Sequence, residues 1–131
     1  MANVSVDDYQ EKLKNFAGVV VHNGYTHEQL PFILKDVHLG IVPVLWEDNL
    51  LQIAIEMVAC GVPVLCSSFG GASELCNSDL FKFAGGNEES LLERLRMFVE
   101  KPGLCQKYWR YHNGLTNMRK HVEELVNIYY L

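Results

Sequence analysis

The residues of this sequence best suited to chemistry lie in two short polar stretches, each placed soon after an apolar run. Residues 46–49 read Trp-Glu-Asp-Asn and follow the run 39–44, and residues 70–74 read Gly-Gly-Ala-Ser-Glu and follow the run 62–66. Backbone amides at the start of a helix bind anions, and paired glycines let a backbone approach a ligand closely. Both stretches are therefore candidate sites for a phosphorylated ligand.

One carboxylate stands out because it falls in the middle of an otherwise apolar helix. Glu56 lies within residues 50–60, where burying a charge costs free energy unless the charge is paired. Helical spacing places Asn49, Gln52 and Glu56 on one face, so a single polar stripe leads back to the first polar stretch. The stripe either lines a binding site or faces water, and spacing alone leaves both interpretations open.

The second stretch is weaker evidence by itself. An ordinary tight turn explains the pair Gly70 and Gly71 more simply than a ligand does, and Glu74 fits the cap of the short helix that follows. Its value as a candidate site comes from its place in the predicted fold.

The elements that must position these residues are indicated by apolar runs and helix signals. Strands are predicted at residues 19–22, 39–44, 62–66 and 80–83. Helices are predicted at residues 4–16, 27–35, 50–60, 72–76 and 104–111, with one more from Asn87 to the break at Lys101 and a last one from Thr116 or Asn117 onward. Strands that are apolar throughout and alternate with helices indicate an α/β protein, a Rossmann-like open parallel sheet with flanking helices. Ligands of such sheets bind at the carboxyl ends of the strands, where both polar stretches fall.

Several helix ends carry local signals. Thr26 and Gln29 match a capping box, Asn49 is placed to cap the helix 50–60, and Gly61 is placed to end that helix in the left-handed conformation. The last helix has one apolar stripe, which predicts a packing surface. The stripe consists of Met118, Val122, Leu125, Val126 and Tyr129.

Composition and charge exclude several classes of function. The 131 residues carry a formal charge of -5, which disfavours a nucleic-acid partner because phosphate binding needs clustered cations. The 4 cysteines and 5 histidines lack metal-binding spacings, so we expect no metal site and reduced, mostly buried thiols in a cytoplasmic protein. No apolar run approaches the roughly 20 residues that span a bilayer.

In this order, the motifs resemble the nucleotide-sugar donor domain of group 1, or family-4, glycosyltransferases, which have the GT-B fold. The resemblance runs from Val19 to Val99. It is carried by residues 21–24, 39–43, 46–49, 55–57, 61–64 and 70–74. The family's signature is a pair of glutamates separated by seven residues, which falls here on Asp48 and Glu56. Glu47 lies one position from the first of these, and whether Asp48 or Glu47 takes the first acid's role stays open.

The resemblance implies roles for these residues. The first acid, Asp48 or Glu47, would lie beside the transferred sugar, and Glu56 would bind the ribose of the nucleotide. The amides of Asn49, Leu50 and Leu51 would bind the diphosphate or the sugar. Gly70 and Gly71 would shape the wall of the cleft. The implied reaction moves a sugar from a nucleotide-diphosphate sugar to a glycan or lipid acceptor with retention, in polysaccharide or glycolipid biosynthesis, and needs no metal or other cofactor.

The resemblance also implies what lies elsewhere in such an enzyme. The acceptor domain, the first strands of the donor domain and the phosphate-binding Arg and Lys are expected upstream, so residues 1–131 correspond to a single partial donor-binding domain. Between Lys35 and Lys82 there is no Lys or Arg. We therefore expect the isolated chain to be inactive. We expect the full enzyme to be cytoplasmic, with any peripheral membrane association made by the acceptor domain.

Two further expectations concern partners and an alternative function. An apolar edge on the strand 19–22 would be left unpaired, which predicts a homodimer by edge pairing or swapping. The alternative to a transferase fragment is a stand-alone α/β module that binds a phosphorylated ligand without transferring anything. Such a module would bind its ligand with no upstream partner.

Overall fold

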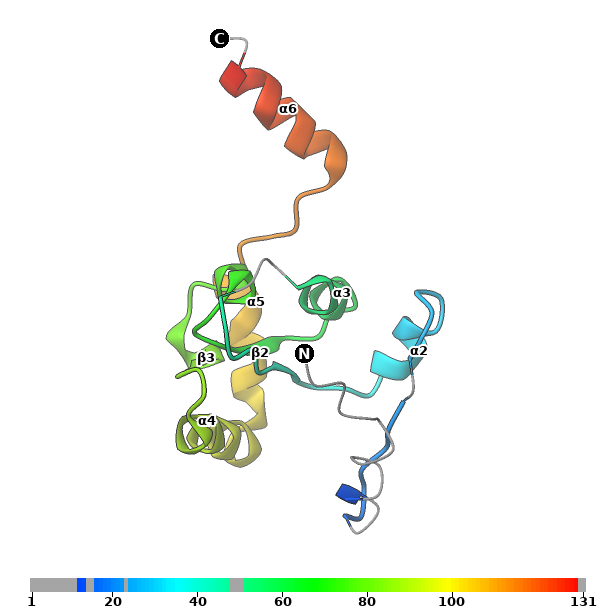
Figure 1. Cartoon of the computed structure of the whole chain (residues 1–131), viewed down its shortest axis with the longest axis vertical. Helices are drawn as coiled ribbons and strands as arrows, with labels where there is room; N and C mark the ends of the chain where they lie inside the picture. The colour runs from blue at the N-terminus through cyan, green and yellow to red at the C-terminus, as the bar shows by residue number, and fades with distance from the viewer. Residues whose placement is uncertain (1–11, 14–15, 23, 48–50, 130–131) are drawn as a thin grey trace. The chain divides into compact units, whose positions relative to one another are not determined.

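The structure is a computed structural model that describes residues 12–13, 16–22, 24–47 and 51–129 (Figure 1). The chain divides into two compact units, Met1–Ile33 and Leu34–Leu131. Most of the predicted helix 4–16 lies outside the described residues. The candidate site belongs to the second unit.

The prediction of a strand at residues 19–22 is wrong. These residues have no regular secondary structure, and the side chain of Val20 is 77% exposed. An apolar run becomes a strand only where a neighbouring strand satisfies its backbone donors and acceptors. Among the described residues, no strand pairs with this run.

The predicted helix 27–35 is present but shorter. A turn at residues 27–29 leads into α2, Leu30–Leu34, whose two end residues are buried. The amide of Thr26 donates to the side-chain oxygen of Gln29 at 3.0 Å, which is one of the two bonds of a capping box.

Three of the four predicted strands form a sheet, and it is parallel as the sequence predicts. They are β1 (Gly40–Val42), β2 (Val64–Ser67) and β3 (Lys82–Phe83), in the order β1-β2-β3. β1 pairs with β2 from Gly40 opposite Val64, and β2 pairs with β3 from Cys66 opposite Lys82. All four residues of β2 are buried, which explains why this stretch is apolar at nearly every position rather than at every second one.

The helix after β1 begins later than predicted. α3 spans Gln52–Ala59, and its N-terminal cap position is Leu51, which makes no side-chain capping bond, so Asn49 does not hold that position. Its end follows the prediction, because Gly61 adopts a φ of 80°. The amide of Gly61 donates to the carbonyl of Val58, and that of Val62 donates to Met57. This pair of bonds is a Schellman motif, and it turns the chain toward β2.

The helix after β3 forms as predicted. α4 spans Glu88–Glu100, and the side chain of Asn87 accepts a hydrogen bond from the amide of Ser90 at 3.0 Å. α3 and α4 lie on opposite faces of the sheet (Figure 1). Phe98 of α4 packs against Phe81 in the core, with ring centroids 5.3 Å apart. The unit also contains the short 3-10 helices η1 (Gly71–Leu75), η2 (Asp79–Phe81) and η3 (Pro102–Lys107), and the helix α5 (Tyr108–Tyr111).

The last helix, α6, spans Met118–Tyr129 and begins after Asn117, whose side chain accepts from the amide of Lys120 at 2.9 Å. No residue of α6 is buried. Its apolar stripe is therefore not a packing surface within the part of the chain that the structure describes. Leu125, the most covered residue of the stripe, is still 39% exposed. We find no helix in the described ranges whose length and apolar character would suffice to cross a membrane.

Candidate functional site

The candidate site lies where β1 and β2 end. Because the two strands are parallel neighbours, their carboxyl ends meet at one edge of the sheet. The first loop, residues 43–47, leaves β1 there, and the second loop, residues 68–70, leaves β2 beside it. The first loop contains the described part of the first polar stretch, Trp46 and Glu47, and the second loop ends at Gly70, the first residue of the second stretch, which continues into η1.

Two hydrogen bonds connect the first loop to the end of β2 and to the second loop. The hydroxyl of Ser67, at the end of β2, donates to the carbonyl of Val44 at 2.7 Å. Further out, the amide of Gly70 donates to the Oε2 atom of Glu47 at 2.9 Å. One bond lies at the base of the loops and the other near their tips, so the two predicted polar stretches come together as one site.

Gly70 has a backbone conformation that requires glycine. Its φ of 74° and ψ of 175° fall in a region that side chains with a Cβ essentially never adopt. The hydroxyl of Ser73 donates to the carbonyl of Gly70 at 2.9 Å, which fixes the start of η1. Gly71 is the first residue of η1, and both glycines are half-buried.

Glu56 lies on α3 with the neighbour that helical spacing predicts. The side-chain amide of Gln52 donates to its Oε1 atom at 2.9 Å, and Glu56 is half-buried. The shared face of these two residues is confirmed. The third member of the predicted stripe, Asn49, lies outside the described residues.

Three of the predicted site residues, Asp48, Asn49 and Leu50, fall outside the described residues. Their roles stay predictions. Leu51 is described, is half-buried, and its carbonyl accepts the amide of Ala54 at 3.0 Å as the first bond of α3.

A residue that the sequence reasoning missed adds to the rim of the site. The side-chain amide of Asn113 donates to the carbonyl of Glu74, and its backbone amide donates to Leu75 at 3.0 Å. The segment after α5 is thereby attached to η1. The turn signal His112-Asn113-Gly114 was the local indication that this asparagine had a structural role.

A cavity of about 280 Å³ lies between these elements. Ile55 of α3, Gly71 and Glu74 of η1, and residues 113–116 line it. Ile55 of α3 therefore lies across the cavity from Gly71 and from the segment after α5. Glu47, Gly70 and Glu56 are not among the residues that line it, so the cavity lies beside the joined loops and shares only Gly71 and Glu74 with the second polar stretch.

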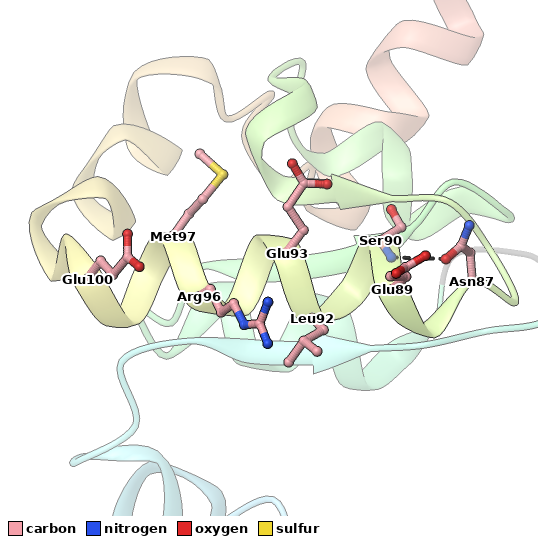
Figure 2. A pocket seen from close by; sticks show the side chains of 8 residues that line it. All are labelled: Asn87, Glu89, Ser90, Leu92, Glu93, Arg96, Met97 and Glu100. Carbon is pink, nitrogen blue, oxygen red and sulfur yellow. Dashed lines mark hydrogen bonds between the residues drawn. The ribbon is translucent and has the colours of Figure 1, made fainter.

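Larger hollows lie elsewhere in the second unit. One of about 650 Å³ runs along α4, where Glu89, Glu93, Arg96 and Glu100 stand beside one another on a single helix (Figure 2). Another of about 330 Å³ is lined by His38, Leu39 and Pro63, at the amino ends of β1 and β2. Ligands of open parallel sheets bind at the carboxyl ends, so neither hollow coincides with the candidate site.

The described part of the site offers backbone amides and carboxylates. Among the described residues, no three His, Cys, Asp or Glu side chains are grouped so that they could hold a metal ion. The thiols of Cys66, Cys76 and Cys105 are buried, and burial raises the pKa of each of them. They belong to the core, as predicted, whereas Cys60 is exposed.

The open parallel sheet, with helices on both faces and two joined loops at its carboxyl edge, defines a Rossmann-like α/β domain. The family model described as glycosyl transferases group 1 matches residues 4–101. The chain belongs to this family, in agreement with the resemblance that its motifs indicate. No curated protein and no solved structure matches the chain.

Proposed function

We propose that this chain is the nucleotide-sugar-binding part of a group 1 glycosyltransferase. The donor, a nucleotide-diphosphate sugar, binds at the carboxyl edge of β1 and β2, and the enzyme transfers the sugar with retention to a glycan or lipid acceptor in polysaccharide or glycolipid assembly. The observation that carries the proposal is the bond between Glu47 and Gly70, which joins the two polar stretches in a chain of this family.

The proposed roles combine the family resemblance with the positions of the residues that the structure describes. Glu56 binds the ribose, since it is half-buried on α3 and one of its oxygens is oriented by Gln52. Asp48 lies beside the transferred sugar, and the amides of Asn49, Leu50 and Leu51 bind the diphosphate or the sugar. The start of α3 supports the last role for Leu51, its N-terminal cap residue, because amides there lack partners within the helix and carry partial positive charge.

Gly70 and Gly71 form the wall of the cleft. A residue larger than glycine at Gly70 would strain the backbone, so this wall stays thin where a ligand has to approach. The cavity beside Gly71 and Glu74 gives room next to that wall.

The proposed reaction uses no metal and no cofactor. Backbone amides and basic side chains stabilise a leaving diphosphate by hydrogen bonds and charge. Residues 36–81, which contain all the predicted site residues, have no Lys or Arg, so the cations must come from elsewhere. Two charge-assisted bonds of about 1.5 to 3 kcal/mol each correspond to roughly two to four orders of magnitude in donor affinity. We therefore expect weak donor binding and no sugar transfer by these 131 residues alone.

We also propose that the chain forms a homodimer through the edge of its sheet. In the described part of the chain, β1 pairs with β2 alone, and Ile41 in its middle is 40% exposed. An unpaired edge is a template for a strand of another molecule.

A cytoplasmic location belongs to the proposal as well, because three buried thiols without disulfide partners fit a reducing compartment.

A titration of the ¹⁵N-labelled chain with UDP and GDP, followed by amide chemical shifts, tests the donor site. We expect shifts in residues 44–56 and 67–74, with a dissociation constant in the millimolar range. Shifts outside these segments, or none at millimolar nucleotide, would contradict the proposed site. Inorganic pyrophosphate is the control ligand: a response equal to that of UDP favours a general phospholigand-binding module, because the ribose contact of Glu56 would then contribute nothing.

A further inference from the structure

The sequence offers Glu47 and Asp48 as candidates for the family's first acid, and the structure describes Glu47. Glu47 reaches across to the second loop, where its Oε2 atom accepts the amide of Gly70 at 2.9 Å. A carboxylate that accepts a backbone amide makes a charge-assisted hydrogen bond, which is stronger than a neutral one. Glu47 therefore has a defined structural partner, 23 residues further along the chain.

The partner of Glu47 is itself held firmly. Gly70 has a conformation restricted to glycine, and its carbonyl accepts the hydroxyl of Ser73 at 2.9 Å and the amide of Ser73 at 3.3 Å. The second loop is thus anchored to η1 on one side and to Glu47 on the other. A side chain that binds such an anchored amide fixes the position of its own loop.

A second hydrogen bond joins the same two loops. The buried hydroxyl of Ser67 donates to the carbonyl of Val44 at 2.7 Å, at the base of the site. With one bond at the base and one near the tips, the loops can neither splay nor slide without breaking a bond. The mutual spacing of the two loops sets the width of any site between them.

We propose that Glu47 is a positioning residue. Its carboxylate holds the amide of Gly70, fixes the width of the donor site, and keeps that amide away from the anionic ligand. This inference rests on the proposed function. It leaves the position beside the transferred sugar to Asp48, because the carboxylate of Glu47 is engaged with the amide of Gly70.

Two variants of the complete chain separate positioning from a direct role of the charge. Glu47→Gln keeps a side-chain oxygen that can accept the Gly70 amide, and Glu47→Ala removes it. Glu93→Ala, on the exposed face of α4, is the control for loss of one negative charge. Each protein is measured by hydrogen exchange of the Gly70 amide and by the UDP titration of amide shifts.

We expect the Gly70 amide to exchange about three- to tenfold faster in Glu47→Ala than in the native chain, and to change less than about twofold in Glu47→Gln and Glu93→Ala. UDP affinity should fall about fivefold or more in Glu47→Ala and stay within about twofold in Glu47→Gln, because the latter retains the bond that sets the width of the site.

Three results overturn the proposal in distinguishable ways. If the Gly70 amide exchanges at the native rate in Glu47→Ala, the bond from Glu47 does not protect that amide or fix the second loop. If UDP binding is lost equally in Glu47→Gln and Glu47→Ala while Gly70 stays protected in Glu47→Gln, Glu47 acts on the ligand by its charge. If the native chain shows no UDP shifts, the proposed function fails and the role of Glu47 fails with it, whatever the exchange of Gly70.

Discussion

The hydroxyl of Ser67 donates a hydrogen bond to the carbonyl of Val44 over 2.7 Å, and the side chain of Ser67 is completely buried. The bond extends the contact between β1 and β2 past the end of their ladder, which stops at Val42 opposite Cys66. Serine is the natural residue here because its short side chain reaches the carbonyl while the surrounding strand stays buried.

Replacing this serine should destabilise the protein. Ser67→Ala leaves the half-buried carbonyl of Val44 without its side-chain donor, and a lost partner of a buried polar group costs about 1 to 3 kcal/mol. Urea unfolding measures the loss. Ser68→Ala is the control, since Ser68 is exposed and its bond to the amide of Gly85 at 3.2 Å lies near water. An equal loss of unfolding free energy in both variants would mean that the buried bond contributes no more to stability than the exposed one.

The role of Glu56 is tested by two substitutions on nucleotide binding. Glu56→Gln preserves shape and removes the charge that would accept the ribose hydroxyls, and we expect UDP affinity to fall about tenfold, which corresponds to about 1.4 kcal/mol for one charged hydrogen bond. Gln52→Ala removes the residue that orients Glu56 and should cost less, about two- to threefold. Shift titrations measure both. UDP binding by Glu56→Gln at native affinity would exclude Glu56 from the donor site.

Gly61 should resist replacement for a conformational reason alone. Its φ is 80°, and a Cβ built on it meets nothing within 4 Å, so Gly61→Ala introduces backbone strain and no clash. The left-handed conformation costs a residue with a Cβ about 1 to 2 kcal/mol. Gly103→Ala is the matched control, since a Cβ there also meets nothing within 4 Å but its φ is not positive. Urea unfolding should show a loss for Gly61→Ala and none for Gly103→Ala; equal effects would show that strain at the end of α3 is not what matters.

The elements that the sequence predicted correctly are those whose signals are local. The stretch around β2 was recognisable because a strand buried on both faces has almost no polar positions. Asn87 and Gly61 were recognisable because a cap and a left-handed helix end each need particular residues. Gln52 and Glu56 were placed on one face by helical spacing, which the structure confirms.

The features that were missed depend on contacts between distant segments. The run 19–22 has the composition of a strand, but a strand also needs a partner for its backbone, and apolar content does not reveal one. The bond from Gly70 to Glu47 spans 23 residues and that from Asn113 to Glu74 spans 39, so no local pattern indicates either. The stripe of α6 has the periodicity of a packing surface, yet periodicity does not say what covers it.

The buried thiol of Cys66 should make stability depend on alkaline pH. Burial raises its pKa from 9.0 to about 11, with Cys76 adding to the rise and Lys82 opposing it. In the unfolded chain the thiol ionises near its ordinary pKa, whereas in the folded protein it keeps its proton up to the raised one. Its contribution to stability is therefore complete below about pH 9 and is lost as the pH rises toward about 11, by about 2 to 3 kcal/mol.

Urea unfolding at a series of pH values between 8 and 11 checks this sign and window. Cys66→Ala should lower stability throughout, because it leaves a cavity, and should flatten the decline above pH 9. The decline should not vanish, since burial also raises the pKa of Cys76, Cys105 and Tyr108. Cys60→Ala is the control, because Cys60 is exposed. A decline as steep in Cys66→Ala as in the native chain would contradict the assignment.

A charge introduced on the exposed edge of β1 should weaken the proposed homodimer. A lysine on an edge strand disfavours pairing with another strand, because its charge would have to leave water at the interface. Ile41→Lys, at a position that is 40% exposed, should therefore shift the chain from dimer toward monomer. Val99→Lys, on α4 and 79% exposed, adds the same charge away from the edge and should leave the dimer intact. Light scattering at several concentrations measures both, and a native chain that stays monomeric at the highest concentration would refute pairing through this edge.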